Sequence, residues 1–100
     1  MSGCIVIYRW DIPQEQEDAF RQRWRDVTLQ LRSRAGALGS CLTRDGEGRF
    51  VAIALWPSEE ARSNGFSALV PLDPLPGVGR PQETLLQVED DLWLSSPFGL

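Results

Sequence analysis

The sequence predicts one α+β domain, in which a four-stranded antiparallel sheet carries two helices on one of its faces. Three observations lead to this fold class: an amphipathic helical pattern early in the chain, short apolar runs separated by turn signals, and a length of 100 residues with 42% hydrophobic side chains. Such a length is too small for two independent cores. We therefore expect residues 1–100 to form a single domain.

The first strand leads directly into a long helix. Residues 4–10 are rich in β-branched and aromatic side chains, and the run stops at Asp11-Ile12-Pro13. Residues 14–35 follow a helical period, with acidic side chains early, arginines late and Gly36 directly after them. The large apolar side chains of this segment recur at spacings of four, three and four, as on one face of a helix: Phe20, Trp24, Val27 and Leu31.

A hairpin and a short helix come next. Residues 38–44 and 49–56 flank the turn sequence Asp45-Gly46-Glu47-Gly48, which predicts two antiparallel strands. Ser58 is a good N-cap, because its hydroxyl can accept a hydrogen bond from the first turn of a helix. The two glutamates that follow it are stabilised near a helix N-terminus by the helix dipole. We expect this second helix to end near residue 69.

The last third of the chain is predicted as loop, strand and tail. Residues 70–82 are punctuated by prolines and glycines, which exclude both a helix and a central strand. Residues 83–94 become apolar and extended again and predict the last strand. Residues 95–100 are predicted as a tail.

The resulting order βαββαβ is the split βαβ, or ferredoxin-like, arrangement. In this arrangement the first strand lies between the third and the fourth. Cys4 and Cys41 are then separated by an intervening strand, about twice the 4.8 Å spacing of neighbouring strands. We expect no disulfide between them.

The third strand is apolar on both faces. One face carries Phe50, Ala52, Ala54 and Trp56, and the other carries Val51, Ile53 and Leu55. Because helices cover only one face of such a sheet, the second face, extended by Ile5 and Ile7, needs another cover. We expect a homodimer formed through the sheet face, although a central strand with modest apolar exposure would explain the pattern as well.

Composition excludes several classes of function. The net charge is −4, which lacks the basic patch that nucleic-acid binding requires. The chain contains no histidine, so it lacks the usual general base and the commonest metal ligand, and its two cysteines are too few for a disulfide framework. Its apolar runs are shorter than the roughly 20 residues of a membrane span. We expect no nucleic acid, membrane, metal or haem partner, and a cytoplasmic location.

Several features together resemble one family: the early strand ending in Trp10, the helix bearing Phe20 and Trp24, and above all the sequence Trp56-Pro57-Ser58-Glu59-Glu60-Ala61. They are similar to the antibiotic biosynthesis monooxygenase (ABM) family of dimeric α+β barrels. The resemblance covers roughly residues 4–70. It implies a pocket between sheet and helices and, in some members, oxygenation of polycyclic phenols or quinols without metal or flavin. Other members degrade haem.

The resemblance assigns Trp56 to the pocket wall. On the same strand face Ala52 and Ala54 would leave volume beside the helices, opposite Phe20, Trp24 and Phe66. These five residues are our candidate substrate-binding residues, and Trp56 is a candidate catalytic one. The alternative is that Trp56 simply fills the core at the end of the sheet. The family's pocket asparagine has no counterpart on a strand here, because the only asparagine is Asn64 on the short helix.

Tyr8 and Asp90 complete the candidate catalytic set. Tyr8 shares a strand face with Val6 and Trp10, and its phenol could orient a bound oxygen; otherwise it is an aromatic residue at the edge of the core. Asp90 has the same parity as Leu86 in the expected last strand and would be an inward-pointing carboxylate able to act as a base. The acidic run around Asp90 is equally typical of a solvated strand end.

Two functions follow. The first is a cofactor-independent monooxygenase acting on an electron-rich aromatic, such as a quinol or a polyketide-like compound, whose anion passes an electron to dioxygen. The second is a non-catalytic dimeric module that binds a small apolar ligand or scaffolds a partner. The missing asparagine and histidine favour the second function.

Overall fold

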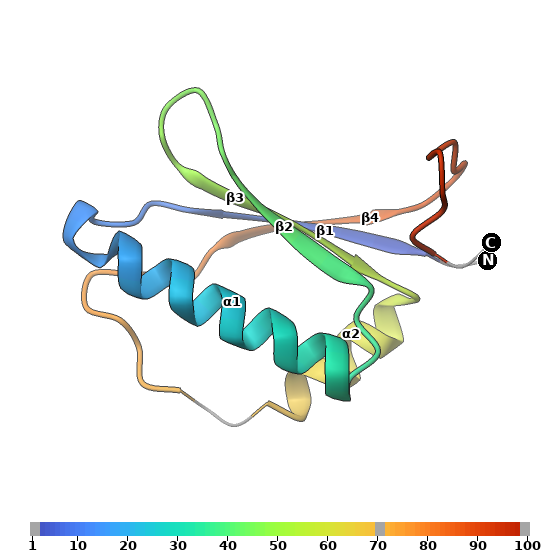
Figure 1. The fold of residues 1–100 in the computed structure, drawn as a ribbon, viewed down its shortest axis with the longest axis horizontal. Helices are drawn as coiled ribbons and strands as arrows, with labels where there is room; N and C mark the ends of the chain where they lie inside the picture. The colour runs from blue at the N-terminus through green and yellow to red at the C-terminus, as the bar shows by residue number, and fades with distance from the viewer. Residues whose placement is uncertain (1–2, 70–71, 99–100) are drawn as a thin grey trace.

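The computed structural model describes residues 3–69 and 72–98, and it places both helices on one side of a single sheet (Figure 1). The start of the predicted loop at residues 70–71 and the end of the predicted tail at residues 99–100 lie outside the described residues. Within the described part of the chain, no helix is long and apolar enough to cross a membrane.

The sheet has the strand order β2-β3-β1-β4, and every neighbouring pair is antiparallel. This confirms the split βαβ arrangement, with β3 between the strands that carry the two cysteines; both thiols are free. The elements follow the chain as β1 (Cys4–Trp10), a 3₁₀ turn (Gln14–Gln16), α1 (Glu17–Arg34), β2 (Gly39–Arg44), β3 (Phe50–Trp56), α2 (Glu59–Ser67) and β4 (Gln82–Gln87).

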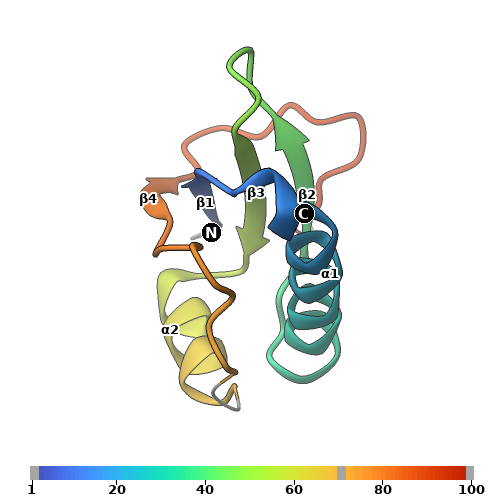
Figure 2. The same ribbon diagram turned by 90° about the vertical axis from the view of Figure 1, so that its left-hand side faces the viewer.

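The two faces of the sheet differ in burial. The inner face, toward the helices, carries most of the core: Cys4, Val6 and Tyr8 of β1 and Phe50, Ala52 and Trp56 of β3. The outer face carries Ile5, Ile7, Val51, Ile53 and Leu55, which are only partly covered, with Ile53 38% exposed. Figure 2, turned by 90°, shows both helices on the same side of the sheet. The prediction that β3 is apolar on both faces, one of them uncovered, is confirmed.

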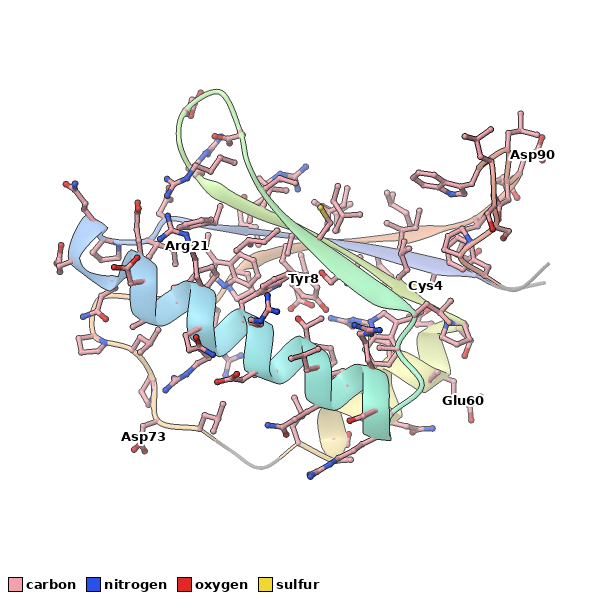
Figure 3. All side chains as sticks on the ribbon, in the orientation of Figure 1. Cys4, Tyr8, Arg21, Glu60, Asp73 and Asp90 are labelled. Atoms are coloured by element: carbon pink, nitrogen blue, oxygen red, sulfur yellow. The ribbon has the colours of Figure 1, made fainter. Side chains whose placement is uncertain are left out.

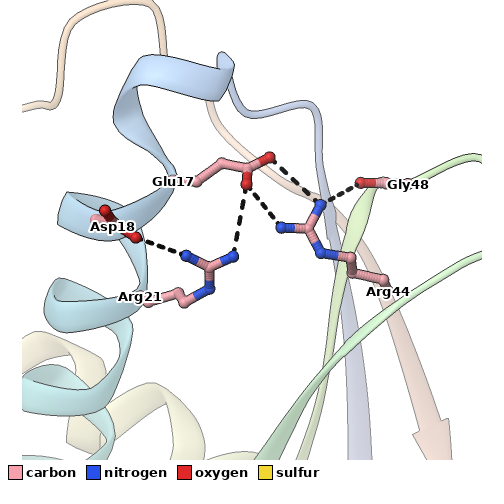
Figure 4. Close-up of polar contacts among 5 residues, drawn as sticks. All are labelled: Glu17, Asp18, Arg21, Arg44 and Gly48. Atoms are coloured by element: carbon pink, nitrogen blue, oxygen red, sulfur yellow. Dashed lines mark hydrogen bonds and ion pairs between the residues drawn. The ribbon is translucent and has the colours of Figure 1, made fainter.

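An ion-pair network fixes the start of α1 against the hairpin (Figure 4). Arg44 of β2 donates from Nη2 to Glu17 Oε1 over 2.7 Å and from Nη1 to the carbonyl oxygen of Gly48 over 3.1 Å. The hydrogen bond from Arg44 lowers the pKa of Glu17. Arg21 joins the network through Glu17, at 3.5 Å, and is also paired with Asp18, at 2.8 Å. These contacts aim the apolar face of α1 at the inner sheet face.

Two glycines adopt the left-handed backbone that their turns require. Gly36, after α1, has a φ of 75°, and Gly48, in the hairpin, has a φ of 82°. Asp45 completes the hairpin turn, because its Oδ1 accepts hydrogen bonds from the backbone N–H of Glu47 and Arg49 at 2.9 and 3.0 Å. The predicted glycine cap of α1 and the predicted hairpin are thereby confirmed.

Helix α2 packs against the sheet through a glycine. Ser58 caps its first turn, since Ser58 Oγ accepts from the backbone N–H of Ala61 at 3.1 Å, as predicted. Gly65 lies over Trp56 so closely that a Cβ there would sit 2.8 Å from the indole ring and 2.9 Å from the Cβ of Ala35. The end of α1, α2 and β3 therefore meet at this glycine.

The last strand is shorter than predicted. β4 ends at Gln87 rather than at residue 94, although the Val88 N–H still donates to the Gly3 carbonyl at 2.9 Å. The chain then turns because Asp91 Oδ1 accepts from the backbone N–H of Trp93 at 3.1 Å, and Ser96 also bonds the Asp91 carboxylate. The side chains around this turn, among them Trp93 at 61% exposed, leave the sheet instead of extending it.

We predict that Gly65→Ala destabilises the protein. In an exposed helix this change would stabilise by about 1 kcal/mol, but here the methyl group must displace Trp56 or Ala35, so we expect a net loss of about 1–3 kcal/mol. Urea unfolding measures it. The control is Asn64→Ala, an exposed position of the same helix, which should be neutral or stabilising. A Gly65→Ala protein as stable as the Asn64→Ala protein would contradict the close packing.

Candidate functional site

A partly open cavity of about 800 Å³ lies between the inner sheet face, both helices and the segment from Pro74 to Pro81. Figure 2 shows that segment running past the two helices below the sheet. The lining is mainly apolar and aromatic, which suits an organic ligand. Its side chains from the sheet and helices include Tyr8, Trp10, Phe20, Trp24, Val27, Leu31, Ser40, Ala54, Trp56, Arg62, Phe66 and Glu83.

Aromatic rings contact one another along the cavity wall. Tyr8 stacks on Trp10 with 5.7 Å between ring centroids, and Trp10 meets Phe20 edge-on at 4.9 Å. Phe66 of α2 lies 6.0 Å from Trp56 and 6.5 Å from Tyr8. Because these rings hold each other in place, the wall presents a rigid aromatic surface to a ligand.

Three polar side chains form a chain across three elements at the centre of this wall. Arg62 of α2 donates from Nε to the Tyr8 phenol oxygen over 3.1 Å, and its Nη2 is paired with Glu83 of β4. Tyr8 and Glu83 are direct partners in the β1–β4 register. Figure 3 shows Tyr8 between the sheet and α1, near the middle of the molecule.

Tyr8 is held as a neutral phenol. Burial raises its pKa, and the hydrogen bond and positive charge of Arg62 offset only part of that rise. Arg62 occupies an acceptor position of the phenol oxygen, and no described residue accepts the phenol proton. Tyr8 is therefore able to donate a hydrogen bond into the cavity.

The cavity carries an excess of positive charge. Its lining includes Arg23, Arg62 and Arg80 but, among the described residues, only one carboxylate, that of Glu83. Arg23 donates to the backbone carbonyl of Asp73, which ties the segment after α2 to α1. A guanidinium excess in a largely apolar site favours a ligand that is, or becomes, an anion.

Comparison with known proteins agrees with this architecture. The sequence model of the family described as "Antibiotic biosynthesis monooxygenase" matches residues 4–67. The chain belongs to the antibiotic biosynthesis monooxygenase family. No curated protein matches the chain.

Several solved structures share the fold. The heme-degrading protein Rv3592 from Mycobacterium tuberculosis is 19% identical, with a TM-score of 0.70 over 92% of this chain and 97% of that one. SnoaB, a cofactor-independent oxygenase from Streptomyces nogalater, studied as a point mutant, is 14% identical, with a TM-score of 0.70 over 92% and 98%. Rv0793 from Mycobacterium tuberculosis is 19% identical, with a TM-score of 0.63 over 90% and 98%.

The lining residues of this ABM chain do not fit a haem iron. The sequence has no histidine. Cys4 lies in the core and Cys41 on the exposed side of β2, and neither lines the cavity. Tyr8, the remaining candidate ligand, is engaged by Arg62. Among the described residues no group of three or more His, Cys, Asp or Glu side chains could hold a metal ion.

Most of the predicted site residues line the cavity of this ABM domain. Tyr8, Phe20, Trp24, Ala54, Trp56 and Phe66 all do so. Ala52 does not: it is 1% exposed and packed in the core, so its predicted place in the pocket is wrong. Trp56 is 1% exposed as well, so it both fills the core and forms part of the wall.

The prediction for Asp90 is also wrong. Asp90 is exposed, lies beyond the end of β4 and is not part of the lining. Figure 3 places it on the side of the sheet away from the helices, far from Tyr8. The parity argument failed because β4 ends before Asp90 and the chain turns at Asp91.

Sequence reasoning missed Arg62, Glu83 and Ser40. Arg62 could have been found, because it precedes Phe66 by four residues and therefore shares its helical face. Glu83 carried no such signal, because its position opposite Tyr8 depends on the β1–β4 register across a long loop. Ser40 carried no such signal either, because its place on the cavity wall depends on the β2–β3 register.

We predict that Tyr8 titrates above its ordinary pKa of 10.0. Tyr8 is the only tyrosine in the chain, so the absorbance of tyrosinate reports it alone. Because the pKa of Tyr8 is higher in the folded state, the contribution of Tyr8 to stability is fully present below the pKa of the unfolded state. It is lost as the pH rises through the pKa of the folded state. Arg62→Met should raise the midpoint further, because it removes the hydrogen bond that favours tyrosinate. Arg25→Met, at an exposed arginine outside the lining, should leave it unchanged.

Proposed function

We propose that the protein is a cofactor-independent monooxygenase acting on an electron-rich aromatic, such as a quinol or a polyketide-like compound. One observation carries the proposal: an aromatic-walled cavity in which the Tyr8 phenol and the Arg62 guanidinium act on the same space. The shared fold of the oxygenase SnoaB supports it as an analogy.

The residues of the cavity suit stabilisation of a substrate anion. A phenol or the enol of an anthrone must lose a proton before it can reduce dioxygen. Arg62 lowers the pKa of a bound phenol by its charge, and Tyr8 donates a hydrogen bond to the oxygen that becomes negative. Trp56 and Phe66 hold the ring system and exclude water, which strengthens both interactions.

The oxygenation step balances without a further reductant. The substrate anion transfers one electron to dioxygen, and the two radicals combine to form a peroxide at the reacting carbon. Loss of water from the protonated peroxide then breaks the O–O bond and leaves a carbonyl. A CH₂ group and O₂ thus become C=O and H₂O, with the substrate itself as the electron donor.

We predict that Arg62→Met lowers kcat/KM for anthrone oxidation by about 10²-fold, because it removes the charge that stabilises the substrate anion. Tyr8→Phe should cost about tenfold. Oxygen uptake, corrected for autoxidation of the substrate, measures both. Arg25→Met is the matched control and should retain full activity.

The outcome separates the two candidate functions. If oxygen uptake with the wild-type protein never exceeds autoxidation of the substrate, while the aromatic compound still quenches tryptophan fluorescence, the non-catalytic binding module is favoured. A rate that Arg62→Met leaves unchanged would contradict the role given to Arg62.

The outer sheet face supports a homodimer. Its apolar side chains, Ile5, Ile7, Val51, Ile53 and Leu55, are joined by Leu86 of β4, which is opposite Ile5 and 43% exposed. Such a continuous apolar surface is costly in water and is best covered by a second copy.

The two free thiols fit a reducing cytoplasm, which we propose as the compartment of the protein.

We predict a mass of about twice 11.2 kDa by light scattering. Ile53→Asp should give a folded monomer, because a carboxylate at the partly exposed outer face is tolerated by the monomer but not in a closed interface. Leu29→Asp, at a similarly exposed apolar residue of α1, should leave the dimer intact. A monomeric wild-type protein at micromolar concentration would contradict this interface.

A further inference from the structure

Residues 88–98 form a hook whose two ends are fixed beside the start of β1. The Val88 N–H donates to the Gly3 carbonyl at 2.9 Å, and the ring of Phe98 lies so close to Gly3 that a Cβ there would be 2.8 Å from it. Between these ends the Asp91 carboxylate closes a turn. The hook is therefore a shaped part of the fold rather than a loose end of the chain.

The tip of the hook is apolar and exposed. Leu92 is 89% exposed, and the described part of the chain also covers little of Trp93 and Leu94. Figures 1 and 2 show the hook on the side of the sheet away from the helices, where the outer sheet face also lies. An exposed group of large apolar side chains in a fixed shape is typical of an interaction surface.

The hook and Arg9 lie at opposite ends of the sheet. In the β1–β4 register Gln87, after which the hook begins, is opposite Cys4, whereas Arg9 is opposite the first residue of β4. The Arg9 side chain runs along the outer sheet face, because its Nη1 donates at 3.3 Å to Thr84 Oγ1, which shares that face with Leu86. The length of β1 thus separates the hook from the Arg9 of its own chain.

Arg9 borders a basic hollow at its end of the sheet. The hollow has a volume of about 360 Å³, and its lining includes Arg9, Arg49 and Arg80 but, among the described residues, only one carboxylate, that of Asp11. Arg49 is already paired with Asp45. Arg9 and Arg80 form no ion pair with any described residue. The basic hollow therefore has guanidinium groups to offer an acidic partner.

The base of the hook carries the opposite charge. Glu89 and Asp90 are exposed and form no ion pair with a described residue. We propose that in the homodimer the hook of each copy docks at the Arg9 end of the outer sheet face of the other copy. The acidic base then meets the basic hollow, and the apolar tip covers apolar sheet surface.

Twofold symmetry allows both hooks to dock in the same way. A twofold axis between the two outer faces, perpendicular to the strands, brings the hook end of one copy to the Arg9 end of the other. Neither end then meets its own like charge. The inference rests on the proposed homodimer, but not on the monooxygenase activity.

Removal of the apolar tip tests the hook. We expect the triple variant Leu92→Ser, Trp93→Ser, Leu94→Ser to raise the dimer Kd at least about 100-fold in sedimentation equilibrium, because two apolar tips are lost per dimer. Its far-UV circular dichroism should match that of the wild type, since these side chains are exposed within one chain. The matched control is Leu29→Ser on α1, which should leave the Kd unchanged. An unchanged Kd of the triple variant would overturn the proposal and leave the homodimer in place.

Cysteine cross-linking tests where the hook docks. In a Cys41→Ser background, we would oxidise the Asp90→Cys and Arg9→Cys proteins separately and as an equimolar mixture after subunit exchange. We expect a disulfide-linked dimer in the mixture alone, and none when Leu29→Cys replaces Asp90→Cys.

The other outcomes separate this proposal from the proposed function. Self-linkage of the Asp90→Cys protein would overturn the proposal, because the two hooks would then lie together, and so would a mixture that gives no linked dimer. A monomeric wild-type protein would overturn the homodimer together with the hook. A linked dimer without oxygen uptake would support the hook and overturn only the monooxygenase function.

Discussion

The contact between Trp56 and Gly65 sets the geometry on which the cavity depends. Trp56 ends β3 fully buried, and α2 approaches its indole through a residue that has no side chain. The same glycine faces Ala35 directly after α1, so both helices are held to the sheet at this end. Away from this contact the side chains of the helices leave the cavity open, and aromatic residues from both the sheet and the helices line it.

The electrostatics of the cavity follow from this packing. With α2 close to the sheet, Arg62 reaches both Tyr8 on β1 and Glu83 on β4. Glu83 keeps a partly exposed side chain, whereas Tyr8 is almost fully buried. The guanidinium thus extends from the rim of the cavity to its interior, where a low dielectric strengthens the effect of its positive charge. A neutral donor and a fixed cation side by side are what a developing oxyanion requires.

Membership of the ABM family and the residues of this particular cavity support different conclusions, the first about the fold and the second about the chemistry. The family and its solved relatives, all below 25% identity, establish the fold. The chemistry must come from the side chains present, which among the described lining residues include a phenol, guanidinium groups, one carboxylate and several hydroxyl groups. This set contains neither histidine nor a thiol, and it suits a substrate that supplies its own electrons.

The sequence by itself determined the element order, the strand order and the two apolar faces of β3, because helical and strand periodicities and turn residues such as Ser58 and Gly36 act locally. Only the tertiary structure decided which polar groups share the cavity. Asp90 was misplaced because side-chain bonds of Asp91 end the strand early, and Ala52 because its small side chain is covered by the core. Tyr8, Arg62 and Glu83 come together through strand register and helix docking, and no local pattern encodes contacts between residues so far apart in the chain.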